Sequence, residues 1–382
     1  MIRVAIKMIM GDRLKFFGLL IGLSFASMLI TQQAAIFLGY TTRTWAFIDD
    51  VPSPDIWVMD PQVLFTEDFK PIADTAVQRV RAVEGVRWAV PMYKNQLPVR
   101  LRDGTLQACT VVGVDDATLI GAPPLMVEGA PEHLRQSDGV IVDARASDLS
   151  IVDASGVRRA LALGDTLSVN DNTARVVGVA TLTKAFYWQP VIYTTYSRAL
   201  AWAPPQRRQL TYVLAKADPG EAIDAVARRI EDTTGLRALT RDEFIRMTAS
   251  YTLDKTGILI NFGITVALGF VIGLLVGGQT FFNYVADNLK TFGALKALGM
   301  NNLGLVRMIG AQVVVVGLLG FGIGVGLAAF TGVIFSRIGM GFHLPWQLAV
   351  GSAVSVLCIC AVAALLAGLR ALRVEPGIVF KG

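Results

Sequence analysis

Residues 287–302, with the sequence Asp-Asn-Leu-Lys-Thr-Phe-Gly-Ala-Leu-Lys-Ala-Leu-Gly-Met-Asn-Asn, decide how the rest of the chain is organised. A long apolar run lies on each side of this stretch. The stretch carries Lys290 and Lys296, and Arg307 follows it, against the single acid Asp287. Short basic segments between two membrane spans stay in the cytoplasm, because positive residues resist translocation. The sequence therefore predicts two membrane-spanning helices joined by a cytoplasmic segment.

The same stretch has the spacing of a short helix. Leu289, Phe292 and either Leu295 or Lys296 recur at intervals of three and four residues, which predicts an amphipathic helix. Gly299 is the expected end of this helix, since glycine readily takes the left-handed conformation that closes a helix. A helix across the mouth of two spans would move both spans when a partner presses on it.

The sequence Phe-Gly-Ala-Leu-Lys-Ala-Leu-Gly at 292–299 resembles the coupling segment of MacB/FtsX-type (type VII) ABC transporter permeases, the group that includes the DevC-like exporters. In that family the segment docks on a separate ATPase subunit. The resemblance implies that the residues coupled to the ATPase are Leu289, Phe292, Gly293, Ala294, Leu295, Lys296, Ala297, Leu298 and Gly299. The alternative interpretation is a solvated loop helix that only joins two spans.

The composition indicates a membrane protein with one large soluble portion. Hydrophobic residues make up 53% of the 382 residues and charged residues 17%, where about a quarter is usual in soluble proteins. The pI near 9.1 could indicate a nucleic-acid partner. Residues 41–255, however, hold slightly more acids than bases, and the excess of positive charge flanks the apolar runs. The basic balance is therefore an orientation signal, and no nucleic acid is expected.

Four apolar runs are long enough to span the lipid bilayer as helices. They lie at residues 16–40, 258–282, 308–335 and 348–368. Residues 1–15 read as a cytoplasmic interfacial helix, with a disordered N-terminus as the alternative. The first run exceeds the apolar region of a cleaved signal peptide, so we expect an uncleaved anchor with the N-terminus inside. The basic tail at 369–380, which also resembles the family's C-terminal signature, places the C-terminus inside.

Residues 41–255 are predicted to form an extracytoplasmic α+β domain, followed by a three-span membrane domain at 256–382. Asp103-Gly104 is a strong hairpin signal between two strands. Expected strands lie at 55–60, 86–91, 96–101, 106–114, 139–142, 165–169, 174–179, 187–193 and 210–215. Expected helices lie at 72–83, 219–233 with Asp218-Pro219 as its start, and 241–253. Helix and strand at both ends around a strand-rich middle predict two lobes, the middle one inserted into the outer one.

Glycines recur at four-residue spacing in the predicted spans. The pattern involves Gly18 and Gly22 in the first span, Gly269, Gly273 and Gly277 in the second, and Gly320, Gly324, Gly322 and Gly326 in the third. Such spacing lets helix backbones approach closely. Helix packing, including a homodimer interface, is one interpretation. The general abundance of glycine in membrane helices is the other.

The motifs of common catalytic sites are missing from the sequence. There is no Gly-x-x-x-x-Gly-Lys-Ser/Thr phosphate loop, no Gly-x-Ser-x-Gly elbow and no His-Glu-x-x-His. Three cysteines and two histidines are scattered, so neither a disulfide framework nor a metal site follows. We expect no cofactor, no metal and no catalysis in this chain, with ATP and Mg²⁺ on the partner ATPase.

Together these features predict a non-catalytic permease subunit of an ABC exporter in the bacterial inner membrane. The resemblance implies a homodimer with a separate ATPase, which extrudes an amphiphilic substrate from the extracytoplasmic side, often with a periplasmic adaptor and an outer-membrane channel. A mechanotransmitter that activates a cell-wall hydrolase is the first alternative. A membrane-anchored sensor or scaffold is the second, and it leaves the basic coupling segment unexplained.

Overall fold

The computed structural model describes residue 8 and residues 10–144, 149–152, 157–186 and 189–372. The chain divides into two compact units. The soluble unit is Thr41–Thr256, and the membrane unit combines Met1–Tyr40 with Gly257–Gly382. Most of the predicted interfacial helix at 1–15 lies outside the described residues.

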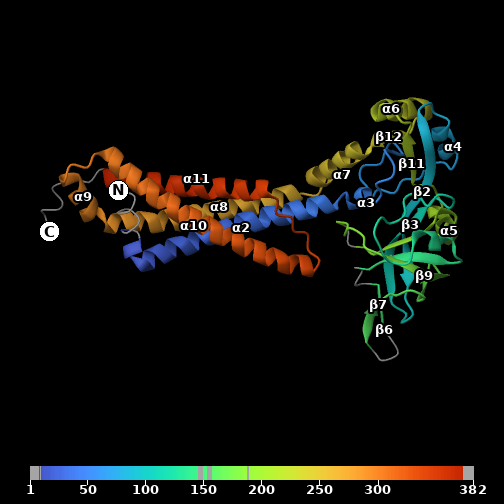
Figure 1. The fold of residues 1–382 in the computed structure, drawn as a ribbon, viewed down its shortest axis with the longest axis horizontal. Helices are drawn as coiled ribbons and strands as arrows, with labels where there is room; N and C mark the ends of the chain where they lie inside the picture. The colour runs from blue at the N-terminus through green and yellow to red at the C-terminus, as the bar shows by residue number, and fades with distance from the viewer. Residues whose placement is uncertain (1–7, 9, 145–148, 153–156, 187–188, 373–382) are drawn as a thin grey trace. The chain divides into compact units, whose positions relative to one another are not determined.

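Four helices among the described residues are long and apolar enough to cross a membrane. They are α2 (Arg13–Arg43), α8 (Ile258–Asp287), α10 (Asn302–Arg337) and α11 (Trp346–Leu372) (Figure 1). Each predicted span is confirmed as a helix, and each helix continues beyond its apolar run. Asn301 fixes the start of α10, because its Oδ1 accepts a hydrogen bond from the backbone N–H of Gly304 at 2.8 Å.

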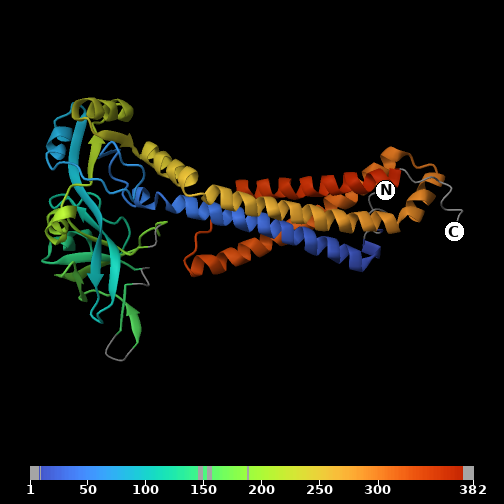
Figure 2. The same cartoon turned by 180° about the vertical axis from the view of Figure 1, so that it is seen from behind.

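Helices α2, α8, α10 and α11 lie side by side in the membrane unit (Figures 1 and 2). Helix α11 packs against both α8 and α10. Polar side chains join the helices at two buried points. The Thr31 hydroxyl of α2 shares a hydrogen bond of 2.5 Å with Ser352 of α11, and Gln312 Nε2 of α10 donates to the Tyr284 hydroxyl of α8 at 3.0 Å. Such bonds stabilise helix contacts where no water competes.

The soluble unit is built on a ten-stranded sheet in the order β12-β1-β11-β2-β3-β10-β5-β9-β4, with β8 paired to β2 and β9. A separate hairpin joins β6 and β7. The strands are β1 (Ile56–Met59), β2 (Val86–Arg100), β3 (Leu106–Val114), β4 (Met126–Glu128), β5 (Gly139–Asp143), β6 (Ser150–Val152), β7 (Arg158–Ala160), β8 (Thr166–Val169), β9 (Asn172–Ala180), β10 (Val191–Thr195), β11 (Tyr212–Ala217) and β12 (Arg237–Thr240). The helices are α3 (Ala46–Asp49), α4 (Ala76–Arg81), α5 (Tyr196–Trp202), α6 (Ile223–Thr234) and α7 (Arg241–Lys255), with 3₁₀ turns η1 (Pro131–Arg135) and η2 (Pro205–Arg207).

Strand β2 belongs to two lobes. Its first half pairs with β11, as Met92 does with Tyr212, and its second half pairs with β3 from Tyr93 onward. The outer lobe takes β1, β11, β12, α4 and α6 from the two ends of the unit. Strands β3 to β10 and the second half of β2 form the middle lobe. The plan of a middle lobe inserted into an outer one is therefore the one predicted, and so is the hairpin at Asp103-Gly104, where Gly104 has φ +85°.

Several predicted elements are wrong in extent. The strands expected at 86–91 and 96–101 are one strand, because the pairing partner of β2 changes between lobes while the strand itself continues. The helix expected from Pro219 begins at Ile223, because Gly220 at φ +95° closes a turn before it. Helix α4 is shorter than 72–83, because the backbone N–H of Ile72 donates to Leu210 instead.

Several elements had not been predicted from the sequence. They are α3, α5, β4, β6, β7, β12 and the two 3₁₀ turns, all of them short. Strand β12 follows α6 directly and pairs with β1, which places it at the end of the sheet. A four-residue strand with the sequence Arg-Ala-Leu-Thr carries too little periodicity to be recognised.

Candidate functional site

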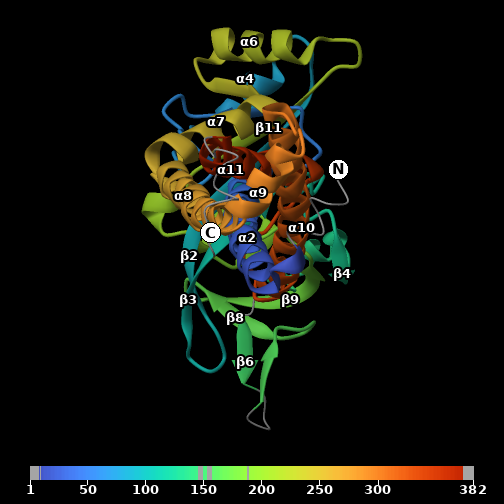
Figure 3. The same ribbon diagram turned by 90° about the vertical axis from the view of Figure 1, so that its left-hand side faces the viewer.

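Helix α9 (Leu289–Ala297) joins the two central spans and is the candidate coupling element. Only Asn288 separates it from α8, and the side-chain amide of Asn288 donates to the Tyr284 carbonyl at 2.8 Å. Figure 3 looks along the helices and shows α9 crossing between α8 and α10. Helix α9 is therefore attached to the end of α8 with a single residue between them.

The end of α9 is closed by a Schellman motif. Gly299 has φ +93°, and its N–H donates to the Lys296 carbonyl at 2.9 Å. The N–H of Met300 donates to the Leu295 carbonyl at 3.0 Å. These bonds satisfy carbonyls that a helix end leaves without partners. The predicted end at Gly299 is therefore where the chain turns, and Asn301 then caps α10 two residues later.

The apolar face of α9 points into the membrane unit rather than outward. Phe292 is fully buried, and Gly293 beside it is buried as well. Phe292 belongs to a core cluster with Tyr284 of α8 and Leu305 of α10, and Leu289 and Leu295 pack against this cluster. The residues that the spacing singled out thus hold α9 to its own helices, and Phe292 does not lie on a surface that a partner could contact.

The outward surface of this region is formed by other residues. Leu298 is 85% exposed, Leu303 is 56% exposed and Val306 is 46% exposed. Lys290 and Arg307 are exposed as well, while Ala294, Leu295 and Lys296 are half-buried. These exposed residues are called the exposed coupling surface below. They are Leu298, Leu303, Val306, Lys290 and Arg307. This surface combines apolar side chains with positive charge at the segment between α8 and α10.

An ion pair ties the start of α2 to the base of α9. The Lys15 ammonium of α2 pairs with the carboxylate of Asp287, the last residue of α8, and also with Asp12 at 2.8 Å. All three side chains are partly exposed, so the pair contributes little to stability by itself. Its position means that the first span is also attached where α9 begins.

Three glycines of α8 at four-residue spacing face the first span. A Cβ at Gly269 would lie 3.3 Å from Ile30, one at Gly273 would lie 2.6 Å from Ala26, and one at Gly277 would lie 3.2 Å from Leu23. Their absence of side chains lets α2 pack directly on α8.

Two glycines of α10, Gly320 and Gly324, face α2. A Cβ at Gly320 would lie 2.8 Å from Leu23, and one at Gly324 would lie 2.5 Å from the Ser24 carbonyl oxygen. Gly322 and Gly326, in contrast, have nothing within 4 Å in the described part of the chain. The spacing thus serves two faces of α10, one that packs on α2 and one that is open.

Several residues of this region were missed by sequence reasoning. Asn301 could have been found, because an Asn before an apolar run is a helix-start signal. Tyr284 and Gln312 could not, since nothing in their spacing says that they meet. Among the described residues, no group of three or more His, Cys, Asp or Glu side chains could hold a metal ion.

Two family models match the chain. The model of the MacB-like periplasmic core domain matches residues 20–233, more than half of the chain. The model of the FtsX-like permease C-terminal domain matches residues 263–376, which include α9 and α10. The chain belongs to the MacB/FtsX-type ABC permease family. As a MacB/FtsX-type permease it is a multi-pass membrane protein, of a family that works with ABC ATPase partners.

Two solved structures are similar to part of this MacB/FtsX-type permease. The extracellular domain of the noncanonic ABC-type transporter YknZ from Gram-positive bacteria is 12% identical, with a TM-score of 0.34 over 49% of this chain and 99% of that one. The periplasmic region of MacB from Actinobacillus actinomycetemcomitans is 12% identical, with a TM-score of 0.38 over 55% of this chain and 96% of that one. No curated protein matches the chain.

Proposed function

We propose that this chain is the non-catalytic permease subunit of an ABC exporter, which couples ATP hydrolysis by a separate cytoplasmic ATPase to extrusion of an amphiphilic substrate from the extracytoplasmic side. The observation that carries this proposal is the burial of Phe292 between α8 and α10. An ATPase that presses on α9 would move these two spans together, because a packed core transmits displacement.

The exposed coupling surface supports docking of a protein partner. An apolar side chain as exposed as that of Leu298 is suited to the centre of an interface, and the flanking Lys290 and Arg307 would steer an acidic partner toward it. The positive charge also supports a cytoplasmic location of this segment. Both termini would then lie on the cytoplasmic side of the bacterial inner membrane.

The composition of the spans favours export by a squeezing movement of the protein. It disfavours a polar path for the substrate through the spans of one chain. No charged residue lies in the apolar runs at 16–40, 258–282, 308–335 and 348–368, and intramembrane charges usually mark ion or proton paths. The open glycine face of α10 at Gly322 and Gly326 supports a homodimer. A periplasmic adaptor and an outer-membrane channel complete the proposed assembly, as for DevC-like exporters.

Copurification tests the proposed function. The tagged chain is purified from native membranes in detergent, and copurifying proteins are identified by mass spectrometry. We expect an ABC ATPase with a phosphate-loop motif, which Leu298→Asp releases and which Leu125→Asp retains. Leu125 is a matched control, because it is 64% exposed but lies in the soluble unit. Absence of an ATPase, or equal retention by Leu298→Asp, would contradict the proposal.

A second measurement separates export from regulation of a cell-wall hydrolase. The purified permease and ATPase are reconstituted in proteoliposomes, and ATP hydrolysis is followed while amphiphiles are added. An exporter responds to its substrate with faster hydrolysis and loss of that substrate from the membrane. A mechanotransmitter instead requires the hydrolase for its effect and moves no amphiphile.

A further inference from the structure

A cavity of about 410 Å³ lies in the soluble unit where β2 passes from the outer lobe to the middle lobe. Its walls come from three segments. They are the loop at 67–71, the β2 residues Asn95 and Gln96, and the segment at 206–211 that leads into β11. Small-molecule sites typically measure about 300–1,000 Å³. The cavity therefore has room for a molecule of metabolite size.

The lining of this cavity is strongly polar. Lys70 and Arg207 supply positive charge, and side-chain amides supply donors and acceptors from both lobes. The apolar contribution comes from Phe69 and Pro71. Sites for drug-like or lipid-like ligands are lined mainly by apolar side chains. The lining thus disfavours an acyl chain and favours a compact ligand with many hydrogen-bonding groups.

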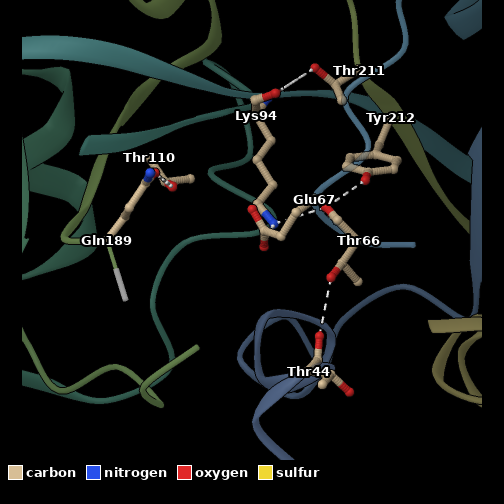
Figure 4. A network of polar contacts seen from close by, with 8 residues as sticks. All are labelled: Thr44, Thr66, Glu67, Lys94, Thr110, Gln189, Thr211 and Tyr212. Atoms are coloured by element: carbon tan, nitrogen blue, oxygen red, sulfur yellow. Dashed lines mark hydrogen bonds and ion pairs between the residues drawn. The ribbon is translucent and has the colours of Figure 1, made fainter. Parts of the chain in front are cut away.

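The one acid in the lining is already neutralised by a buried base. Glu67 Oε1 lies 2.6 Å from the ammonium of Lys94, whose side chain is only 2% exposed (Figure 4). The same ammonium donates to the Thr66 carbonyl at 3.1 Å. Because the charges of Glu67 and Lys94 cancel, Lys70 and Arg207 leave the cavity with a net positive charge. A buried charge pair of this kind has to be fully bonded to be tolerated.

A hydrogen-bond network holds the cavity walls in place. The Thr211 hydroxyl accepts from the N–H of Lys94 and donates to its carbonyl, both at 3.1 Å. The Tyr212 hydroxyl donates to the Thr66 carbonyl at 3.1 Å, and the Thr66 hydroxyl donates to the Thr44 carbonyl at 3.2 Å (Figure 4). Arg207 donates to the backbone carbonyl of Gln96. Walls fixed before binding reduce the entropy lost when a ligand is ordered.

We propose that this cavity binds a small polar oxyanion, a molecule with a carboxylate or phosphate group on a hydrogen-bonding body. Arg207 is suited to the oxyanion, because a guanidinium recognises carboxylate and phosphate through paired N–H donors. Lys70 supplies the second charge, and Asn95, Gln96 and Gln209 bond the rest of the ligand. The bound molecule contacts both lobes. This site is independent of the exposed coupling surface and of any ATPase.

Titration of the full-length protein in lipid nanodiscs tests the proposal. Citrate and inorganic phosphate serve as carboxylate and phosphate probes, at an ionic strength held constant with sodium chloride, and binding is followed by isothermal titration calorimetry. We expect saturable binding of at least one probe, and the tighter one identifies the oxyanion. Arg207→Gln and Lys70→Gln should each weaken binding about tenfold, the effect of losing one charge-assisted hydrogen bond.

Arg208→Gln is the matched control. Arg208 is exposed and adjacent to Arg207 in sequence but does not line the cavity. Its substitution changes the net charge equally and should leave binding unchanged. Hydrogen–deuterium exchange should slow at 67–71 and 206–211 when the tighter probe saturates. The proposal is wrong if neither probe saturates, if Arg208→Gln weakens binding as much as Arg207→Gln, or if exchange in both segments is unaffected.

Discussion

Gln312 on α10 donates a hydrogen bond of 3.0 Å to the hydroxyl of Tyr284 on α8, and both side chains are completely buried. The pair connects the two helices that α9 joins. A single substitution leaves one buried polar group without this partner, which costs about 1–3 kcal/mol. Tyr284→Phe and Gln312→Leu should each lower the thermal unfolding midpoint in detergent. The double variant should lose less stability than the two single variants lose when their losses are added. Additive losses would show that the two residues do not interact.

Phe292 and Leu298 should separate folding from partner binding. Phe292→Ala removes a fully buried ring and should destabilise the membrane unit by about 3–5 kcal/mol. Leu298→Ala changes an exposed side chain and should leave the unfolding midpoint within a degree or two, while copurification of the ATPase falls. Thermal unfolding and copurification are measured on both variants. If Leu298→Ala unfolds as early as Phe292→Ala, the assignment of the two faces of α9 is wrong.

Gly324 and Gly326 lie on different faces of α10 and provide a matched pair. A Cβ at Gly324 would lie 2.5 Å from the Ser24 carbonyl oxygen, whereas in the described part of the chain nothing lies within 4 Å of one at Gly326. Gly324→Ala should therefore force α2 and α10 apart and lower the unfolding midpoint by several degrees. Within a single chain, measured on the monomeric fraction in detergent, Gly326→Ala should be neutral or slightly stabilising, because alanine favours helix more than glycine. Equal effects would contradict the direct packing of α2 on α10.

Asp50 should make the soluble unit less stable at neutral pH than at acidic pH. Burial raises the pKa of this carboxyl to about 6, although hydrogen bonds from Thr183 oppose the shift. A raised carboxyl pKa means that folding favours the protonated form. The resulting penalty is absent below about pH 4, grows between pH 4 and 6, and reaches about 3 kcal/mol above pH 6.

Asp50→Asn tests this pH dependence, because asparagine does not ionise: its Oδ1 can accept the bond from the Thr183 N–H, and its Nδ2 can donate to the Thr183 hydroxyl. The variant should unfold at a higher temperature than the wild type at pH 7.5 and at a similar temperature at pH 4. Unfolding curves of both proteins across this range provide the measurement. A variant that is less stable than wild type at pH 7.5 would show that the Asp50 charge is favourable.

Lys94 and Glu67 should be strongly coupled. Burial lowers the pKa of Lys94, and the nearby Glu67 carboxylate opposes this shift. Breaking a buried pair by removing one partner costs about 3–5 kcal/mol. Lys94→Met and Glu67→Leu should each destabilise the soluble unit, whereas the double variant Lys94→Met/Glu67→Leu should regain much of the loss. Chemical denaturation monitored by circular dichroism tests this, and a double variant as unstable as the sum of both singles argues against the pair.

The structural features that could be predicted are those that depend on residues close together in the sequence. Four spans follow from hydropathy alone, and the end of α9 follows from Gly299. The direction of Phe292 could not be predicted, because an apolar stripe on a short helix can face either its own bundle or a partner. The continuity of β2 was hidden for a similar reason, since the partner of its first half, β11, lies more than a hundred residues further along the chain. The cavity has no sequence signature, because its walls come from three separate segments.

The unbroken course of β2 limits how the two lobes can move. Fifteen residues at about 3.4 Å each give a strand of roughly 50 Å, hydrogen-bonded to one lobe along its first half and to the other along its second. A strand that runs unbroken through both lobes offers no flexible linker at which the lobes could hinge. Excising either lobe would sever β2 and expose strand edges that invite aggregation. The two lobes are therefore tied together along one continuous strand, and a change in their relative orientation has to deform β2 itself.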